Sequence, residues 1–235
     1  MIATVHLADV GPRRALALLR SEPNPSEVPG LHYARVTTRT LLGSHLLPRP
    51  SPGRVGLIAT WEDDQAFDEF LAHHPLAGQL AHGWQVRLQP TRIVGAWPAM
   101  GGLVTEEIAM DDEEPAAVMT LGRLRLSQGA RFLRASAGAE GSAVRSPALL
   151  ASTGLARPPA LVATFSLWSS TAAMRAYVTG GSAPGHLAAL RANSARPFHH
   201  ESAFIRFRPY ASKGEWGGGD PLADQMLTPR IPASS

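Results

Sequence analysis

The sequence predicts an α+β protein built from two similar halves within one chain, and two observations carry that prediction. The order strand–helix–strand–strand–helix–strand can be followed twice along the 235 residues. The halves can also be aligned on tryptophan, because Trp61 and Trp168 each end a strand-like run and precede a polar residue that can cap a helix. In that alignment Phe67 corresponds to Met174. A duplicated unit of this kind predicts an internal repeat.

In the N-terminal half, β-forming residues and alternating apolar positions predict strands, and apolar residues at helical spacing predict helices. Asp63 or Asp64 is expected to cap the second helix, which carries Phe67 and Phe70 on one face. The Pro-rich segment around Pro50 is expected to be a loop. The predicted strands span about 2–8, 31–38, 55–61 and 84–88, and the first helix about 12–20.

The same order of elements is predicted for the C-terminal half. Ser169 or Ser170 is expected to cap a helix that carries Met174 and Tyr177, the counterparts of Phe67 and Phe70. The remaining helices are expected near 130–137 and from about His186, and the strands near 118–121, 149–153, 161–168 and 203–208.

An acidic, proline-containing segment separates the halves and is the best candidate for a linker. Each half also closes with a Gly-x-Trp element, at residues 95–97 and 214–216. Because each βαββαβ sheet has helices on one side only, its other side must be buried. We therefore expect two ferredoxin-like repeats packed face to face as a dimeric-α/β-barrel-like fold within one chain. The expected parts are 1–105, the linker 106–115, 116–217 and a flexible tail 218–235.

Composition excludes several classes of protein. The chain has no cysteine, which excludes disulfides, thiolate metal sites and a haem bound through a protein thiolate. Its basic residues are arginines apart from Lys213 and are scattered, which argues against nucleic-acid binding. The arginine bias itself fits a GC-rich genome or the recognition of carboxylates. Because no targeting peptide and no membrane-spanning stretch can be recognised, we expect a soluble, cytoplasmic protein.

Motifs for hydrolysis or nucleotide binding are not found, so histidine is the remaining source of reactivity. None of the histidine pairs has a spacing that is diagnostic of a metal site. His186 follows a Gly/Pro loop at the start of an amphipathic helix, where a ring can project into a cavity between helix and sheet. The alternative is a histidine that only packs or forms a hydrogen bond at the start of the helix.

Several segments resemble the spheroidene monooxygenase family, from about residue 30 to residue 217. In the first half these are Pro48-Arg49-Pro50, Leu57-Ile58-Ala59-Thr60-Trp61 and Gly95-Ala96-Trp97. In the second half they are Phe165-Ser166-Leu167-Trp168, Met174-Arg175-Ala176-Tyr177, the loop before His186, Leu190-Arg191 and Ala203-Phe204-Ile205-Arg206-Phe207-Arg208-Pro209. The residues around Phe198-His199 and Gly43-Ser44-His45 depart from the family pattern, which puts the identity of the substrate in doubt.

The resemblance implies a monooxygenase that contains haem iron, takes electrons from a ferredoxin-like donor and oxidises the end of an acyclic carotenoid in carotenoid biosynthesis. It matches His186 to a family histidine, which makes this residue the candidate axial ligand of the haem iron. Arg191, Arg206 and Arg208 are candidate partners of the haem propionates. For Arg206 and Arg208 the alternative is a pair of solvent-facing strand residues that flank buried Phe207. The expected enclosure of the haem is the space between the paired sheets.

Two other functions stay open at this point. One is a haem- or ligand-binding α/β barrel without catalytic turnover, and the other is a cofactor-free barrel that acts in assembly or stress response. A long apolar small molecule is the expected substrate. The oligomeric state is left open, with a homo-oligomer among the alternatives.

Overall fold

The computed structural model describes residues 1–41, 49–179 and 184–226, without the side chains of 41, 49–50, 138–140, 142, 184–187, 190 and 226. Within these residues no helix is both long enough and apolar enough to cross a membrane.

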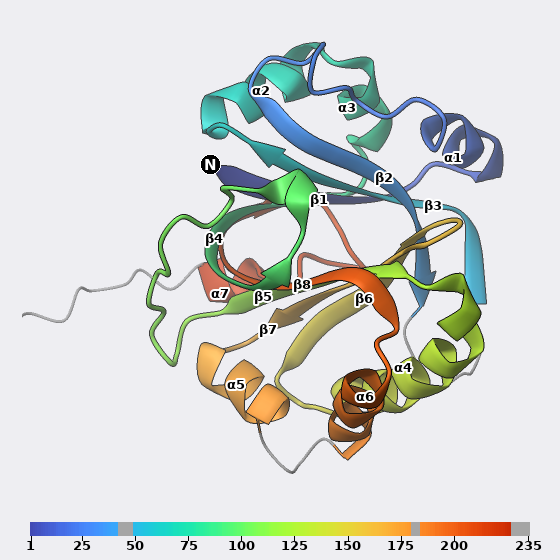
Figure 1. Cartoon of the computed structure of the whole chain (residues 1–235). Coiled ribbons are helices and arrows are strands. Elements are labelled where there is room, and N and C mark those ends of the chain that lie inside the picture. The colour runs from blue at the N-terminus through green and yellow to red at the C-terminus, as the bar shows by residue number, and fades with distance from the viewer. Residues whose placement is uncertain (42–48, 180–183, 227–235) are drawn as a thin grey trace, which may run out of the picture.

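The N-terminal half contains four strands and three α-helices, in the expected order apart from the additional helix α3, which follows α2 directly (Figure 1). Asp63 caps α2 as predicted, because its carboxylate accepts a hydrogen bond from the Ala66 N–H at 2.9 Å. The elements are β1 (Ile2–Asp9), α1 (Pro12–Leu18), β2 (Leu31–Leu41), β3 (Arg49–Trp61), α2 (Asp64–His73), α3 (Pro75–Leu80) and β4 (Trp84–Ala96), followed by the 3₁₀ turn η1 (Pro98–Met100).

The C-terminal half begins at Ala116 after the irregular acidic segment. Ser170 caps its α5 helix, because the Ser170 hydroxyl accepts a hydrogen bond from the Ala173 N–H. The elements are β5 (Ala116–Leu124), η2 (Leu126–Gln128), α4 (Gly129–Val144), β6 (Leu149–Arg157), β7 (Leu161–Trp168), α5 (Thr171–Thr179), α6 (Pro184–Ala195), β8 (His199–Lys213) and α7 (Ala223–Met226).

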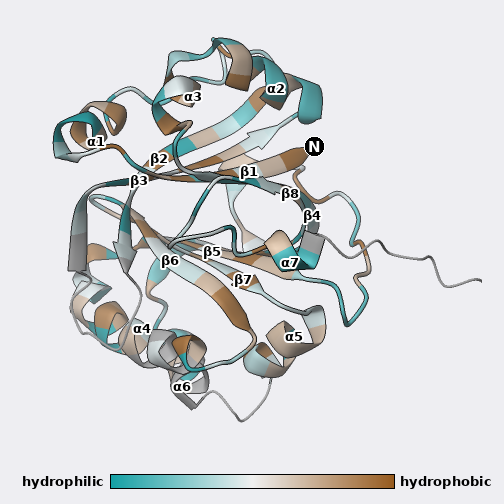
Figure 2. Ribbon diagram, turned by 180° about the vertical axis from the view of Figure 1, so that it is seen from behind, coloured by the Kyte–Doolittle hydropathy of each residue, from teal (hydrophilic) through white to brown (hydrophobic). Residues whose placement is uncertain are grey.

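The eight strands form one closed barrel in the order β1-β3-β2-β6-β7-β5-β8-β4. The order β4-β1-β3-β2 in the first half is repeated as β8-β5-β7-β6 in the second. Helices α1 to α3 lie on one side of the barrel and α4 to α6 on the opposite side (Figures 1 and 2). The α+β class and a barrel made from both halves are therefore as the sequence predicts.

The tryptophan alignment holds in three dimensions. Trp61 packs its ring against Phe67 and Phe70 at centroid distances of 5.4 and 4.9 Å. Trp168 packs against Tyr177 at 5.0 Å in the second half. Each of these contacts joins the end of a strand to the helix that follows it.

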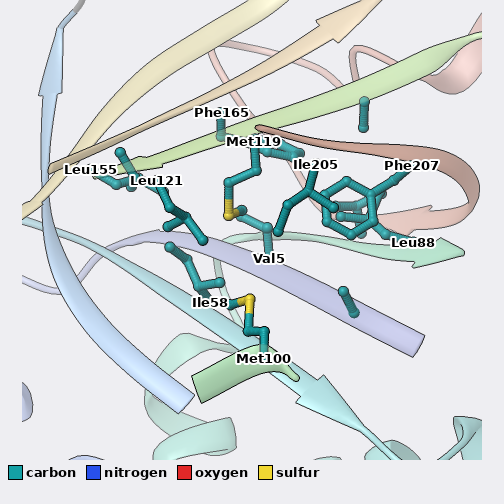
Figure 3. Packing of buried hydrophobic residues seen from close by; sticks show 14 of the residues in the cluster. Val5, Ile58, Leu88, Met100, Met119, Leu121, Leu155, Phe165, Ile205 and Phe207 are labelled. Atoms are coloured by element: carbon teal, nitrogen blue, oxygen red, sulfur yellow. The ribbon is translucent and has the colours of Figure 1, made fainter. Parts of the chain in front are cut away.

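The space inside the barrel is filled by apolar side chains from both halves (Figure 3). Met119, Phe165 and Phe207 are each at most 2% exposed. The expectation that the paired sheets enclose a porphyrin is therefore wrong. Strand alternation sends apolar residues of β1, β4, β5, β7 and β8 inward, and among the described residues their side chains pack closely enough to leave no room there for a macrocycle.

The two Gly-x-Trp elements cover opposite ends of β4. Trp97 follows the last residue of β4, whereas Trp216 packs on Trp84, its first residue, at 5.1 Å. Gly95 and Gly214 have φ values of +92° and +91°. A Cβ at either glycine would collide with a backbone carbonyl oxygen, so both positions require glycine.

Two local expectations are wrong, and one helix was missed. The predicted loop around Pro50 includes the start of β3, since Pro50 pairs with Thr40. This part of β3 pairs with β2 but lies beyond its pairing with β1, so a proline without an N–H is tolerated there. Helix α3 was not predicted. The segment 218–235, which was expected to be a flexible tail, contains α7 and also Leu222, whose side chain is fully buried. Residues 227–235 lie outside the described part.

Candidate functional site

The sheet of the C-terminal half is incompletely covered on its helix-facing side. On β5, Met119 and Leu121 point into the barrel, so Val118 and Thr120 point toward the helices. Thr120 is exposed although its strand is paired on both sides, with Thr164 on β7 and Phe204 on β8 opposite it. An exposed residue in the middle of a central strand means that the helices leave this part of the sheet open.

The equivalent part of the N-terminal half is closed. Ile2 pairs with Trp61, and Ala116 pairs with Trp168, so His6 is the counterpart of Thr120. The His6 side chain lies beneath Phe67 of α2 and is only 2% exposed.

The difference between the halves comes from their helices. In the N-terminal half, α1, α2 and α3 contribute large side chains to one continuous apolar cluster with the sheet. In the C-terminal half, α4 and α6 pack chiefly against each other. Among the described residues, the apolar cluster on this face consists of Met110, Ala116, Val118, Trp168 and Met174, with partly buried neighbours. The open face therefore lies where the described helical side chains of the second half cover the sheet incompletely.

A half-buried imidazole borders the open face. The ring of His199 lies over Gly122, two residues along β5 from Thr120, and a Cβ at Gly122 would lie 2.6 Å from the His199 Nε2 atom. Phe132 of α4 packs edge-on against the ring at 5.2 Å. The Nε2 atom is buried and has no hydrogen-bond partner in the described structure, and burial lowers the pKa of His199. A glycine in a central strand is the sequence signal that could have revealed this close approach.

The predicted axial ligand lies in α6. Residue 186 is the third residue of that helix, but the side chain of His186 falls outside the described part of the structure, so its role stays a prediction. Arg191 lies further along α6, and its side chain is exposed.

The guanidinium groups of Arg206 and Arg208 form hydrogen bonds and ion pairs with other residues of the protein. The Arg206 guanidinium donates to the Thr91 hydroxyl at 3.1 Å and pairs with Glu107 at 3.4 Å. The Arg208 guanidinium pairs with Glu114 at 3.0 Å. Arg206 is only 6% exposed, so the alternative of two solvent-facing strand residues is wrong for it. Both arginines hold the acidic segment against β8.

No group of three or more histidine, cysteine or carboxylate side chains is arranged to hold a metal ion within the described residues. A site formed by several protein ligands therefore has no support in that part of the chain.

The fold places this protein among the α+β barrels, and comparisons with known proteins identify its family more closely. No family model matches the sequence. A spheroidene monooxygenase from Rubrivivax gelatinosus is 32% identical over 195 residues, which cover 81% of this chain and 73% of that protein. A spheroidene monooxygenase from Rhodobacter capsulatus is 24% identical, over 79% of this chain and 78% of its own length.

Among solved structures, an aldoxime dehydratase in complex with butyraldoxime matches with a TM-score of 0.50 and 9% identity, over 88% of this chain and 79% of that chain. At this identity the match shows the fold alone. The two sequence relatives place the chain among the monooxygenases. It belongs to the spheroidene monooxygenase family.

Proposed function

We propose that this protein is a haem-dependent monooxygenase that oxidises an acyclic carotenoid or a similarly long apolar molecule. Dioxygen and electrons from a ferredoxin-type donor would complete the reaction. The substrate class comes from the names of the two sequence relatives. The structural observation that carries the proposal of a cofactor in this half is the open helix-facing side of the C-terminal sheet.

The residues around this face fit a flat, mostly apolar group with polar edges. Phe204 and Val162 are half-buried there, and Thr120 and Thr164 supply small polar side chains. The unpartnered Nε2 of His199 is an unsatisfied buried polar atom at the border of the face. Such atoms are rare in folded proteins and call for a ligand or a water.

In this proposal His186 binds the haem iron from α6, and Arg191, exposed on the same helix, pairs with a propionate. Arg206 and Arg208 are left out, because their guanidinium groups already have carboxylate partners. Bound haem would supply the activation of dioxygen. The side chains of the face would exclude water and hold the apolar substrate, and His199 would hold a proton beside them.

We also propose that the two halves are ferredoxin-like repeats of one ancestral unit, joined as a dimeric-α/β-barrel-like fold. The repeated strand order and the matching tryptophans support this origin. The boundaries 1–105, 106–115 and 116–217 follow from it.

The first experiment is an absorption spectrum of the purified full-length protein. We expect a Soret band that weakens or shifts in His186→Ala and is unchanged in His200→Ala, where an exposed histidine is removed. Thr120→Trp should fill the open face and lower the haem content, whereas Thr105→Trp, at an exposed position outside the barrel strands, should not. A colourless protein after expression with ample haem would refute the haem site.

Turnover needs a separate measurement. Reduced ferredoxin, dioxygen and spheroidene should give an oxygenated carotenoid with the wild-type protein. A normal Soret band without product would identify a haem-binding barrel that has no monooxygenase activity on this substrate.

A further inference from the structure

A small hollow lies on the opposite side of the molecule, between the N-terminal sheet and helices α2 and α3. Its volume is about 190 Å³. At about 30 Å³ for each liquid water, this volume corresponds to about six waters and is too small for a porphyrin. The hollow is lined by His6, Leu71, Ala77, Gly78, Leu80, Ala81, Gly83, Gln85 and Lys213.

Three polar side chains form a row across adjacent strands on one wall. His6 of β1 pairs with Gln85 of β4, and Gln85 pairs with Lys213 of β8. Residues that are directly opposite on neighbouring strands point to the same face, so all three side chains point toward the helices. Lys213 is the only lysine of the chain.

This wall offers hydrogen-bond donors and a positive charge. The Nε2 atom of His6 is buried without a partner, and the residue is 2% exposed. Burial, and then the nearby positive charge of Arg87, lower the pKa of His6 to about 4. The ring is therefore neutral at pH 7, and the donors that face the hollow are the Gln85 amide and the Lys213 ammonium. The lining includes no carboxylate.

The opposite wall is apolar. Leu71 of α2 and Ala77 and Leu80 of α3 line it, together with Ala81. A ligand that satisfies both walls needs an anionic head and a short apolar tail.

We propose that the N-terminal half binds a short-chain carboxylate in this hollow, with its carboxylate toward Gln85 and Lys213 and its tail against α2 and α3. The site is separate from the proposed haem site and does not depend on it. An ordered water cluster is the competing occupant.

Calorimetric titration of the full-length protein with pentanoate tests the class of ligand. We expect saturable binding with a Kd on the order of 1 mM or below. Lys213→Met, which keeps the apolar stem but removes the charge, should weaken binding about tenfold. Pentanamide and inorganic phosphate, which lack the charge and the tail respectively, should bind much more weakly.

Two leucine substitutions test the place of binding. A Cβ at Gly78 of α3 meets open space, so Gly78→Leu can extend into the hollow without a backbone clash. A Cβ at Gly129 of α4 also meets open space, and Gly129→Leu is the matched control. Binding should be lost in Gly78→Leu and kept in Gly129→Leu. The proposal is overturned if the wild type does not bind pentanoate, if Gly78→Leu binds it normally, or if pentanamide binds equally well.

Discussion

Arg208→Met provides the sharpest test of how the acidic segment is held. Arg208 donates from Nε and Nη2 to the Glu114 carboxylate at 3.1 and 3.0 Å. The side chain of Glu114 is 6% exposed and that of Arg208 is 27% exposed. Loss of the arginine removes a cation from a nearly buried carboxylate, and such losses commonly cost about 3–5 kcal/mol when both groups are fully buried.

The expected cost here is smaller. Arg208 is partly solvated, and the Asp111 N–H still donates to Glu114 in the variant. We expect Arg208→Met to lower the free energy of unfolding by about 2 kcal/mol. Urea denaturation measures this change. Glu114→Gln and the double variant complete a mutant cycle, in which a coupling of about 1 kcal/mol or more would identify the pair as the source.

Arg191→Met is the matched control, because Arg191 is exposed on α6. It should leave the unfolding free energy within about 0.5 kcal/mol of wild type and lower the haem content instead. The reasoning is refuted if Arg208→Met loses haem without loss of stability. That result would return Arg208 to the role of a propionate partner.

Three further predictions concern stability. Because the pKa of His6 falls from 6.5 to about 4 on folding, the unfolded chain binds a proton at this residue more readily than the folded protein does. The free energy of unfolding should therefore be highest above pH 6.5 and fall by about 3 kcal/mol as the pH is lowered toward 4. In urea denaturation at several pH values, His6→Gln should reduce this dependence of the unfolding free energy on pH. Gly122→Ala should cost about 1–3 kcal/mol in thermal unfolding, because its Cβ would displace the His199 ring, and an unchanged melting temperature would disprove that contact. Glu22→Gln should cost about 1 kcal/mol, since the half-buried carboxylate pairs with arginines of both halves at 2.9 and 2.7 Å; an effect that does not shrink in about 1 M salt would argue against an electrostatic origin.

The sequence determined most of the elements and their repetition, although helix α3 and the start of β3 were missed. Alternation along β7 predicted a strand with the observed bounds, 161–168, and Asp63 and Ser170 cap α2 and α5 as expected. These features depend on neighbours within a few residues, and a single chain displays such local patterns directly. The match between Trp61 and Trp168 also followed from local spacing.

Tertiary structure decided what the side chains do. From the sequence, Arg206 and Arg208 were candidate partners of the haem propionates. In the structure they form long-range ion pairs with Glu107 and Glu114 instead. His6 and Thr120 occupy equivalent strand positions, yet one is buried and the other exposed. Burial depends on how distant helices cover a sheet, and the residues of a strand do not encode that by themselves. For the same reason, the open face and the hollow at His6 became visible only in the folded chain.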